Sequence, residues 1–120
     1  MKVIKRDGRA VDYDRARISS AIEKANEEVR EKEKATKEDI KFIIRYIEGL
    51  DKKRMLVEDI QDIIERELME LGKYELAKRY IIYRYTREVA RKQDEKILGI
   101  FKNENKEIVS NKVVQNAVFA

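Results

Sequence analysis

Charged side chains crowd around one glycine near the start of the chain. Lys5, Arg6, Asp7 and Arg9 are charged, and Gly8 lies among them. Lysine and arginine beside a tight turn can donate charge-assisted hydrogen bonds to phosphate oxygens. A surface hairpin with solvated charges is the competing interpretation, because exposed charges by themselves contribute little. The stretch predicts either a phosphate-binding turn or a plain surface hairpin.

The residues before this glycine alternate between two faces if they form a strand. Val3 and Lys5 then share one face, and Ile4 and Arg6 share the other. A face that begins with valine and ends with lysine can lie along a nucleotide. Its apolar end would contact the base or the sugar, and the lysine would reach the phosphates.

Two further arginines, Arg15 and Arg17, fall in the first turn of a predicted helix. Cations at this end oppose the helix dipole by a few tenths of a kcal/mol, which is a weak sign of an anion nearby. The exposed N–H groups of the same turn could bind that anion as well. Alternatively, the arginine stems simply cover apolar surface.

An aromatic and cationic pattern recurs later in the chain. Tyr80, Tyr83 and Arg87 are spaced i, i+3 and i+7, on one face of a helix. A ring followed by a cation one turn later can stack a base and reach a phosphate. The alternative is that the tyrosines pack in the core and Arg87 points into water.

The elements that must position these groups follow from the local pattern. Residues 2–13 predict a β-hairpin, because Asp7 and Gly8 suit a two-residue type I′ turn. Asp14 can then N-cap a first helix. A lone hairpin is only marginally stable, so it must pack on the helices, and the space between them is the natural place for a ligand.

Three more helices are predicted from apolar residues at helical spacing. Thr36 and Asp39 resemble a capping box at the start of the second helix, and Gly49 and Gly72 suit the ends of the second and third. Residues 51–55 are expected to be a linker, and the fourth helix is expected to span about residues 73–92. Its inward face is predicted to carry Leu76, Ala77, Tyr80, Ile81, Tyr83 (or Arg84) and Val89. The fold class is therefore α+β, mainly α: an N-terminal β-hairpin packed on a four-helix bundle, with a short apolar C-terminal tail.

Composition narrows the function. The 120 residues suit one domain, and the net charge of +4 permits an anionic partner without requiring one. Cysteine and histidine are both absent, so disulfides, thiol chemistry and the commonest general base and metal ligand are excluded. We expect no catalytic residue and no metal site. No signal peptide or membrane-length apolar run is present, which predicts a cytoplasmic protein.

Two stretches resemble the ATP-cone family. These are VIKRDGRAVDYDRARI at the start and VEDIQDIIERELMELGKYELAKRYIIYRYTRE in the second half. The resemblance covers about residues 2–92, which implies an ATP-cone regulatory domain over residues 1–92. Residues 93–120 are then a linker and tail that lead towards a catalytic domain absent from this chain. The segment from Glu95 onward resembles, more loosely, the linker of anaerobic, glycyl-radical reductases.

The resemblance implies an allosteric role in deoxyribonucleotide synthesis. ATP-cones precede the catalytic part of many ribonucleotide reductases, where ATP favours an active assembly and dATP an inhibited one. The implied effector is ATP or dATP, with magnesium. The implied partners are reductase catalytic domains or subunits and a homo-oligomer, with no membrane and no nucleic acid. By itself the chain is expected not to be an enzyme, but to be the regulatory part of a ribonucleoside-triphosphate reductase.

Matching positions to the family implies a set of nucleotide-binding residues. They are Val3, Lys5, Arg6, Asp14, Arg17, Ile18, Val57, Ile60, Gln61, Tyr83 and Arg87. The apolar members are expected at the sugar and base, and the cations at the phosphates. Three positions depart from other members: Val11 replaces a glutamate, Val57 a threonine and Gln61 a histidine. These departures leave base recognition and the choice between ATP and dATP open.

Two other functions compete with this interpretation. A DNA-associated transcriptional regulator can carry an ATP-cone behind a zinc ribbon, but the chain has no cysteine and only a mild positive charge. A small helical interaction domain that has lost nucleotide binding is the third reading.

Overall fold

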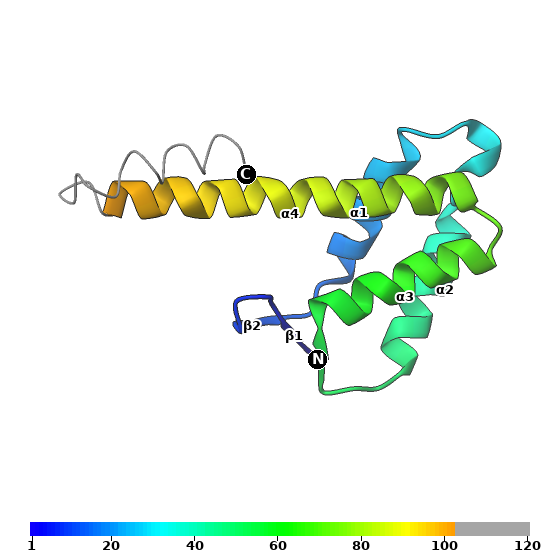
Figure 1. The fold of residues 1–120 in the computed structure, drawn as a ribbon. Helices are drawn as coiled ribbons and strands as arrows, with labels where there is room; N and C mark the ends of the chain where they lie inside the picture. Colours follow the sequence, from blue (N-terminus) through cyan, green and yellow to red (C-terminus); the bar gives the residue numbers. More distant parts are fainter. Residues whose placement is uncertain (103–120) are drawn as a thin grey trace. The chain divides into compact units, whose positions relative to one another are not determined.

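The computed structural model describes residues 1–102, with residue 95 and residues 97–102 described by their backbone alone. The chain divides into two units, Met1–Ile82 and a second unit that begins at Tyr83. Figure 1 shows the elements in chain order. The first unit holds a small sheet, three α-helices and the start of a fourth. The predicted α+β, mainly helical fold is confirmed. No helix in the part of the chain described is long and apolar enough to cross a membrane.

Three short strands form the sheet in the order β2-β1-β3. β1 (Lys2–Ile4) pairs antiparallel with β2 (Ala10–Asp12), which confirms the predicted hairpin. β1 also pairs parallel with β3 (Arg54–Leu56), so Met55 lies opposite Val3. The prediction that residues 51–55 are only a linker is therefore wrong. A three-residue strand is too short to show a period, and its formation depends on a partner far away in the sequence.

The hairpin turn differs from the predicted two-residue type I′ turn. That turn needs a positive φ at both central residues, but Gly8 has φ +88° and Asp7 is not among the positive-φ residues. The Gly8 N–H donates to the Lys5 carbonyl (2.9 Å), and the Lys5 N–H donates to the Arg9 carbonyl (2.8 Å). The loop therefore consists of residues 6–8, with the glycine in the left-handed conformation.

The first helix, α1 (Arg15–Asn26), begins as predicted. Asp14 is its N-cap, and the Asp14 carboxylate accepts a hydrogen bond from the Ala16 N–H (3.0 Å). Ile18, Ile22 and Ala25 are buried on its inner face. A single 3₁₀ turn, η1 (Glu31–Glu33), follows in the charged segment where the apolar pattern weakens.

The second helix, α2 (Lys37–Gly49), starts at the predicted capping box. The Asp39 N–H donates to the Thr36 hydroxyl (3.1 Å), and the Thr36 N–H donates to the Asp39 carboxylate (2.9 Å). Its end differs from the prediction, because Gly49 is still helical and Leu50 is the C-cap. The left-handed residue is Asp51, with φ +50°. Aspartate tolerates this conformation better than most residues.

The third helix, α3 (Val57–Glu70), follows β3 directly and has no side-chain cap, as its sequence indicates. Its C-terminal end confirms the role predicted for Gly72, which has φ +77°. The Gly72 N–H donates to the Met69 carbonyl and the Lys73 N–H to the Leu68 carbonyl, both at 3.0 Å. This pair of bonds is a Schellman motif.

The fourth helix, α4 (Tyr74–Lys102), runs past the predicted end at residue 92. Residues 93–102 contain several good helix formers and no proline, so nothing in the local sequence stops the helix. Leu76, Ala77 and Tyr80 are buried as predicted, but Ile81 is 38% exposed. One residue turns the helix by about 100°, so the position after Tyr80 leaves the buried face. The predicted apolar tail from residue 103 onward lies outside the described residues.

One core joins the sheet to the helices within the first unit. Val3 and Met55 from the sheet are buried together with residues from every helix of that unit. Fully buried side chains include Ile22, Ile43, Ile64, Leu68 and Leu76. Because its strands are so short, the sheet depends on this core for stability. Figure 1 shows the strands beside the start of α3, as the pairing of β1 with β3 requires.

Candidate functional site

A cavity of about 130 Å³ lies within the first unit, among residues of β1, β2, α1, α3 and the first turns of α4. We call it the strand–helix cavity. Most of the residues predicted to bind a nucleotide line it. They are Val3, Lys5, Asp14, Arg17, Ile18, Val57, Ile60 and Gln61. Predicted residues from three separate segments of the chain therefore meet at one place, although their roles as ligands stay a prediction.

The lining divides into an apolar part and a charged part. Val3, Ile18 and Ile60 are buried and give the cavity an apolar floor. Lys5 is half-buried and Arg17 is exposed, so their cationic ends can lie near solvent. Val3 and Lys5, which were predicted to share a face, both line the cavity. The assignment of the apolar part to a base or sugar and of the cations to phosphates stays a prediction.

Arg17 occupies the third position of α1, where the helix dipole disfavours a cation. Among the described residues, its guanidinium has no ion-pair or hydrogen-bond partner. Asp14 lines the same cavity, but its carboxylate already caps α1 at Ala16. Of these two charged side chains, only the arginine can attract an incoming anion, because the Asp14 carboxylate is itself negatively charged.

Arg6 lies in the hairpin loop after the end of β1 at Ile4, and it does not line the strand–helix cavity. It lines an adjoining cavity of about 220 Å³ together with Ile4 and Glu58. Arg6 Nη2 donates to Gln61 Oε1 (3.4 Å), and Arg6 Nε lies 3.4 Å from Glu58 Oε1. Arg6 thus contacts a lining residue of the strand–helix cavity without lining it.

Tyr83 and Arg87 belong to the second unit, where Tyr83 is half-buried and Arg87 is exposed. The strand–helix cavity is lined by residues of the first unit. The assignment of Tyr83 and Arg87 to the nucleotide site stays a prediction.

Several lining residues were absent from the predicted set. They are Val11, Asp12, Tyr13, Ala21, Ile64 and Tyr80. Tyr80 could have been included, because it shares a helix face with Tyr83. Tyr13 and Ile18 stand at the N′ and N4 positions of α1, the spacing of a hydrophobic staple, which predicts that the Tyr13 ring turns inward.

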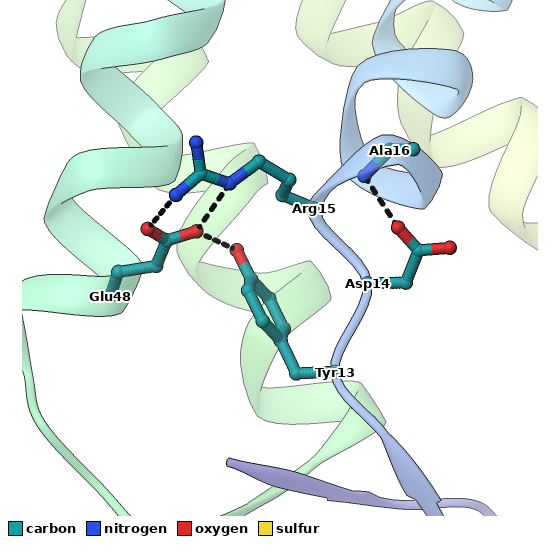
Figure 2. A network of polar contacts seen from close by, with 5 residues as sticks. All are labelled: Tyr13, Asp14, Arg15, Ala16 and Glu48. Carbon is teal, nitrogen blue, oxygen red and sulfur yellow. Dashed lines mark hydrogen bonds and ion pairs between the residues drawn. The ribbon is translucent and has the colours of Figure 1, made fainter.

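Tyr13 belongs to a polar network that ties the start of α1 to the end of α2 (Figure 2). Its hydroxyl donates to Glu48 Oε2 (2.8 Å). Arg15 donates two hydrogen bonds to the same carboxylate, from Nε to Oε2 (3.1 Å) and from Nη2 to Oε1 (2.6 Å). Burial raises the pKa of the Tyr13 phenol well above its usual value, and the hydrogen bond to Glu48 raises it further.

Metal binding by side chains has no support in the described residues. They hold no group of three or more Asp, Glu, His or Cys side chains placed to bind a metal ion. A magnesium ion that enters with a nucleotide would be held by the phosphates, which remains a prediction.

Known proteins resemble this chain over most of its length. The ATP cone domain family matches residues 1–89. Over 98 residues the chain is 35% identical to the ribonucleoside-diphosphate reductase subunit alpha of Chlamydia trachomatis serovar D, covering 72% of this chain and 9% of that protein. It is 36% identical over 106 residues to the vitamin B12-dependent ribonucleoside-diphosphate reductase of Thermoplasma acidophilum, covering 82% of this chain and 13% of that protein. A reductase of the same name from Mycobacterium tuberculosis is 37% identical over 86 residues, 72% of this chain and 12% of that protein.

The chain thus spans only a small part of each of these relatives. These relatives are diphosphate reductases by name, so the likeness to the anaerobic, triphosphate-reducing class stays a prediction. The match over residues 1–89 contains every residue of the strand–helix cavity. The chain belongs to the ATP cone domain family.

Proposed function

We propose that this chain is the regulatory nucleotide-binding domain of a ribonucleotide reductase and binds ATP or dATP at the strand–helix cavity. The observation that carries the proposal is the convergence of β1, α1 and α3 on one cavity with an apolar floor and cations beside it. The relatives named above are reductases, which supports the same function.

The size of the cavity suggests how a nucleotide would lie. Pockets that enclose a small ligand usually measure roughly 300–1,000 Å³, whereas this cavity measures about 130 Å³. Only part of a nucleotide fits inside without rearrangement. We assign the base and sugar to the apolar floor and the phosphates, with any magnesium, to Lys5 and Arg17.

Opposite regulatory effects of ATP and dATP must come from a small chemical difference between the two nucleotides. ATP and dATP differ by one ribose hydroxyl, and two ligands can shift an equilibrium only through their differential binding to its two states. Gln61 brings an uncharged amide to a lining rich in apolar side chains, so we assign it to the ribose or base edge. Control of reductase activity would then follow from changed contacts with catalytic subunits or between copies of the domain.

Calorimetric titration of the purified chain with ATP and with dATP, each with and without magnesium, tests the proposal. Wild-type protein should bind at least one of the two nucleotides. Lys5→Ala and Arg17→Ala should each weaken binding about tenfold or more, because hydrogen bonds to charged groups are among the stronger ones. A tighter fit for dATP would support end-product inhibition.

Arg45→Ala is the matched control for Arg17→Ala. Arg45 is also an exposed helical arginine, and it does not line the strand–helix cavity. Its removal should leave both affinities unchanged. If wild-type protein binds neither nucleotide, the proposal is wrong and a helical interaction domain without a ligand takes its place.

A further inference from the structure

Tyr13 lines two concavities at once. One is the strand–helix cavity, which Val3 and Tyr80 also line, and Tyr13 packs against the core there. The other measures about 490 Å³ and is also lined by Arg15, Glu48 and Lys52. Tyr13 therefore forms part of the wall between the proposed nucleotide site and a second hollow that contains Glu48.

The hydroxyl end of this wall is held by one carboxylate. Glu48 accepts the Tyr13 O–H at 2.8 Å and both Arg15 donors at 3.1 and 2.6 Å (Figure 2). The Glu48 side chain is 28% exposed, and Arg15 is 68% exposed. Three donors on a mostly covered carboxylate fix the phenol more firmly than a single surface hydrogen bond would.

Local rules disfavour both charges of this network. Arg15 is the first residue of α1, where a cation opposes the helix dipole. Glu48 lies in the last turn of α2, where an anion opposes it. Each charge is unfavourable for its own helix and favourable only across the gap between them. Two charges at unfavourable helix ends break a local rule, and residues that break local rules are often functional. The contact between Arg15 and Glu48 is therefore a candidate for a functional role.

The network also reaches an element that is otherwise separate from the cavity. In the described part of the chain, no residue of α2 lines the strand–helix cavity. Glu48 connects Tyr13 to the end of α2, and residues 50–53 lead from there into β3. A shift of the Tyr13 ring would thus change its hydrogen bond to Glu48 and so alter the end of α2.

We propose that Glu48 is a positioning residue for nucleotide binding: through the Tyr13 hydroxyl it holds the ring as a wall of the cavity and couples nucleotide occupancy to the C-terminal end of α2. This inference rests on the proposed function. It assigns a role to Tyr13 and Glu48, which lie outside the predicted set of ligands.

A double-mutant cycle on ATP affinity tests the coupling. Tyr13→Phe and Glu48→Ala should each weaken ATP binding about three- to tenfold, the effect of one net hydrogen bond. The double variant should be no weaker than the weaker single variant, because Glu48 acts through Tyr13. Glu48→Gln removes the charge but keeps an acceptor for the phenol, so it should bind within about twofold of wild type.

Glu75→Ala is the matched control. Glu75 also accepts two donors from one arginine, Arg30, at 3.4 and 2.7 Å, but lies outside the cavity lining. The Glu75→Ala variant should have a lower melting temperature than wild type and an unchanged ATP affinity. A merely structural role for Glu48 would give that same pattern in Glu48→Ala and would overturn the inference.

Backbone amide NMR supplies a readout that stability alone does not move. ATP should shift the amides of residues 48–51 in wild-type protein, and Tyr13→Phe should abolish those shifts at saturating ATP. Persistence of the shifts in Tyr13→Phe would contradict the coupling. Absence of both ATP and dATP binding by wild-type protein would overturn the proposed function as well, whereas ATP binding that Glu48→Ala leaves intact would overturn this inference alone.

Discussion

Several single side chains carry charge at helix ends where the dipole opposes it. Arg15 and Glu48 resolve the conflict by pairing with each other across two helices. Arg17 has no such partner among the described residues, and it lines the strand–helix cavity. An unpaired cation beside an apolar floor is what an anionic ligand needs. At the residue scale, the two arginines of one helix turn thus serve different ends: Arg15 holds the scaffold, and Arg17 is proposed to bind the ligand.

The raised pKa of Tyr13 predicts an alkaline effect on stability. In the unfolded chain the phenol loses its proton near pH 10, whereas in the folded protein it stays protonated to higher pH. The contribution of the Tyr13 phenol to the free energy of unfolding is complete below about pH 10. It is lost as the pH rises above that value, because the unfolded state then binds fewer protons than the folded state. Urea unfolding at pH 9 and pH 11 should show a smaller loss of stability for Tyr13→Phe than for wild type.

Tyr74→Phe is the control for this measurement. Tyr74 is 69% exposed, and removal of its hydroxyl should leave the pH dependence as in wild type. An equal loss of stability in wild type and Tyr13→Phe would contradict the role assigned to the Tyr13 phenol.

At the scale of elements, some helix ends lie where the local sequence predicts them and one does not. The capping box at Thr36 and the Schellman motif at Gly72 both form where the sequence indicates. Gly49 was expected to play the same part as Gly72, yet the chain stays helical there and turns left-handed at Asp51. The network at Glu48 and the strand that follows hold the end of α2, so packing overrides the preference of one glycine.

The two glycines should respond oppositely to alanine. Gly72→Ala places a Cβ at φ +77° and should lower the free energy of unfolding by about 1–2 kcal/mol. Gly49→Ala meets no atom within 4 Å and no positive φ, so it should raise that free energy by up to about 1 kcal/mol. Denaturant unfolding measures both. A destabilising Gly49→Ala would show that the assigned end of α2 is wrong.

At the scale of the whole molecule, the buried core of the described residues ends at Tyr80. Tyr83 and Arg87 come after it, in the second unit. The chain also spans only 9–13% of the reductases named above. The proposed regulation requires that a small domain alter contacts with a much larger remainder, and the proposed coupling to the end of α2 is one route for that change.

Truncation separates the fold from the site. A chain of residues 1–92 should keep a melting temperature within about 4 °C of the full chain, because it retains the described core. It should also keep its nucleotide affinity. A chain of residues 1–82 should still fold, and the family resemblance, which assigns Tyr83 and Arg87 to the site, predicts that it binds ATP more weakly. Equal affinity of both truncated chains would remove these two residues from the proposed site.

Sequence alone determined the hairpin and most helix starts, because turns and caps act over a few neighbouring residues. The fold class followed from the same local signals. Most of the predicted cavity lining came instead from matching positions to the ATP-cone family. Tertiary structure alone decided the third strand, the end of α2 and the Tyr13–Glu48–Arg15 network. The strand pairing and the network join residues that lie 33 or more positions apart in the sequence and depend on a shared core. No local sequence pattern can therefore predict them. The same reason explains the contacts of the loop residue Arg6 with Glu58 and Gln61 of α3, which are more than 50 positions away in the sequence.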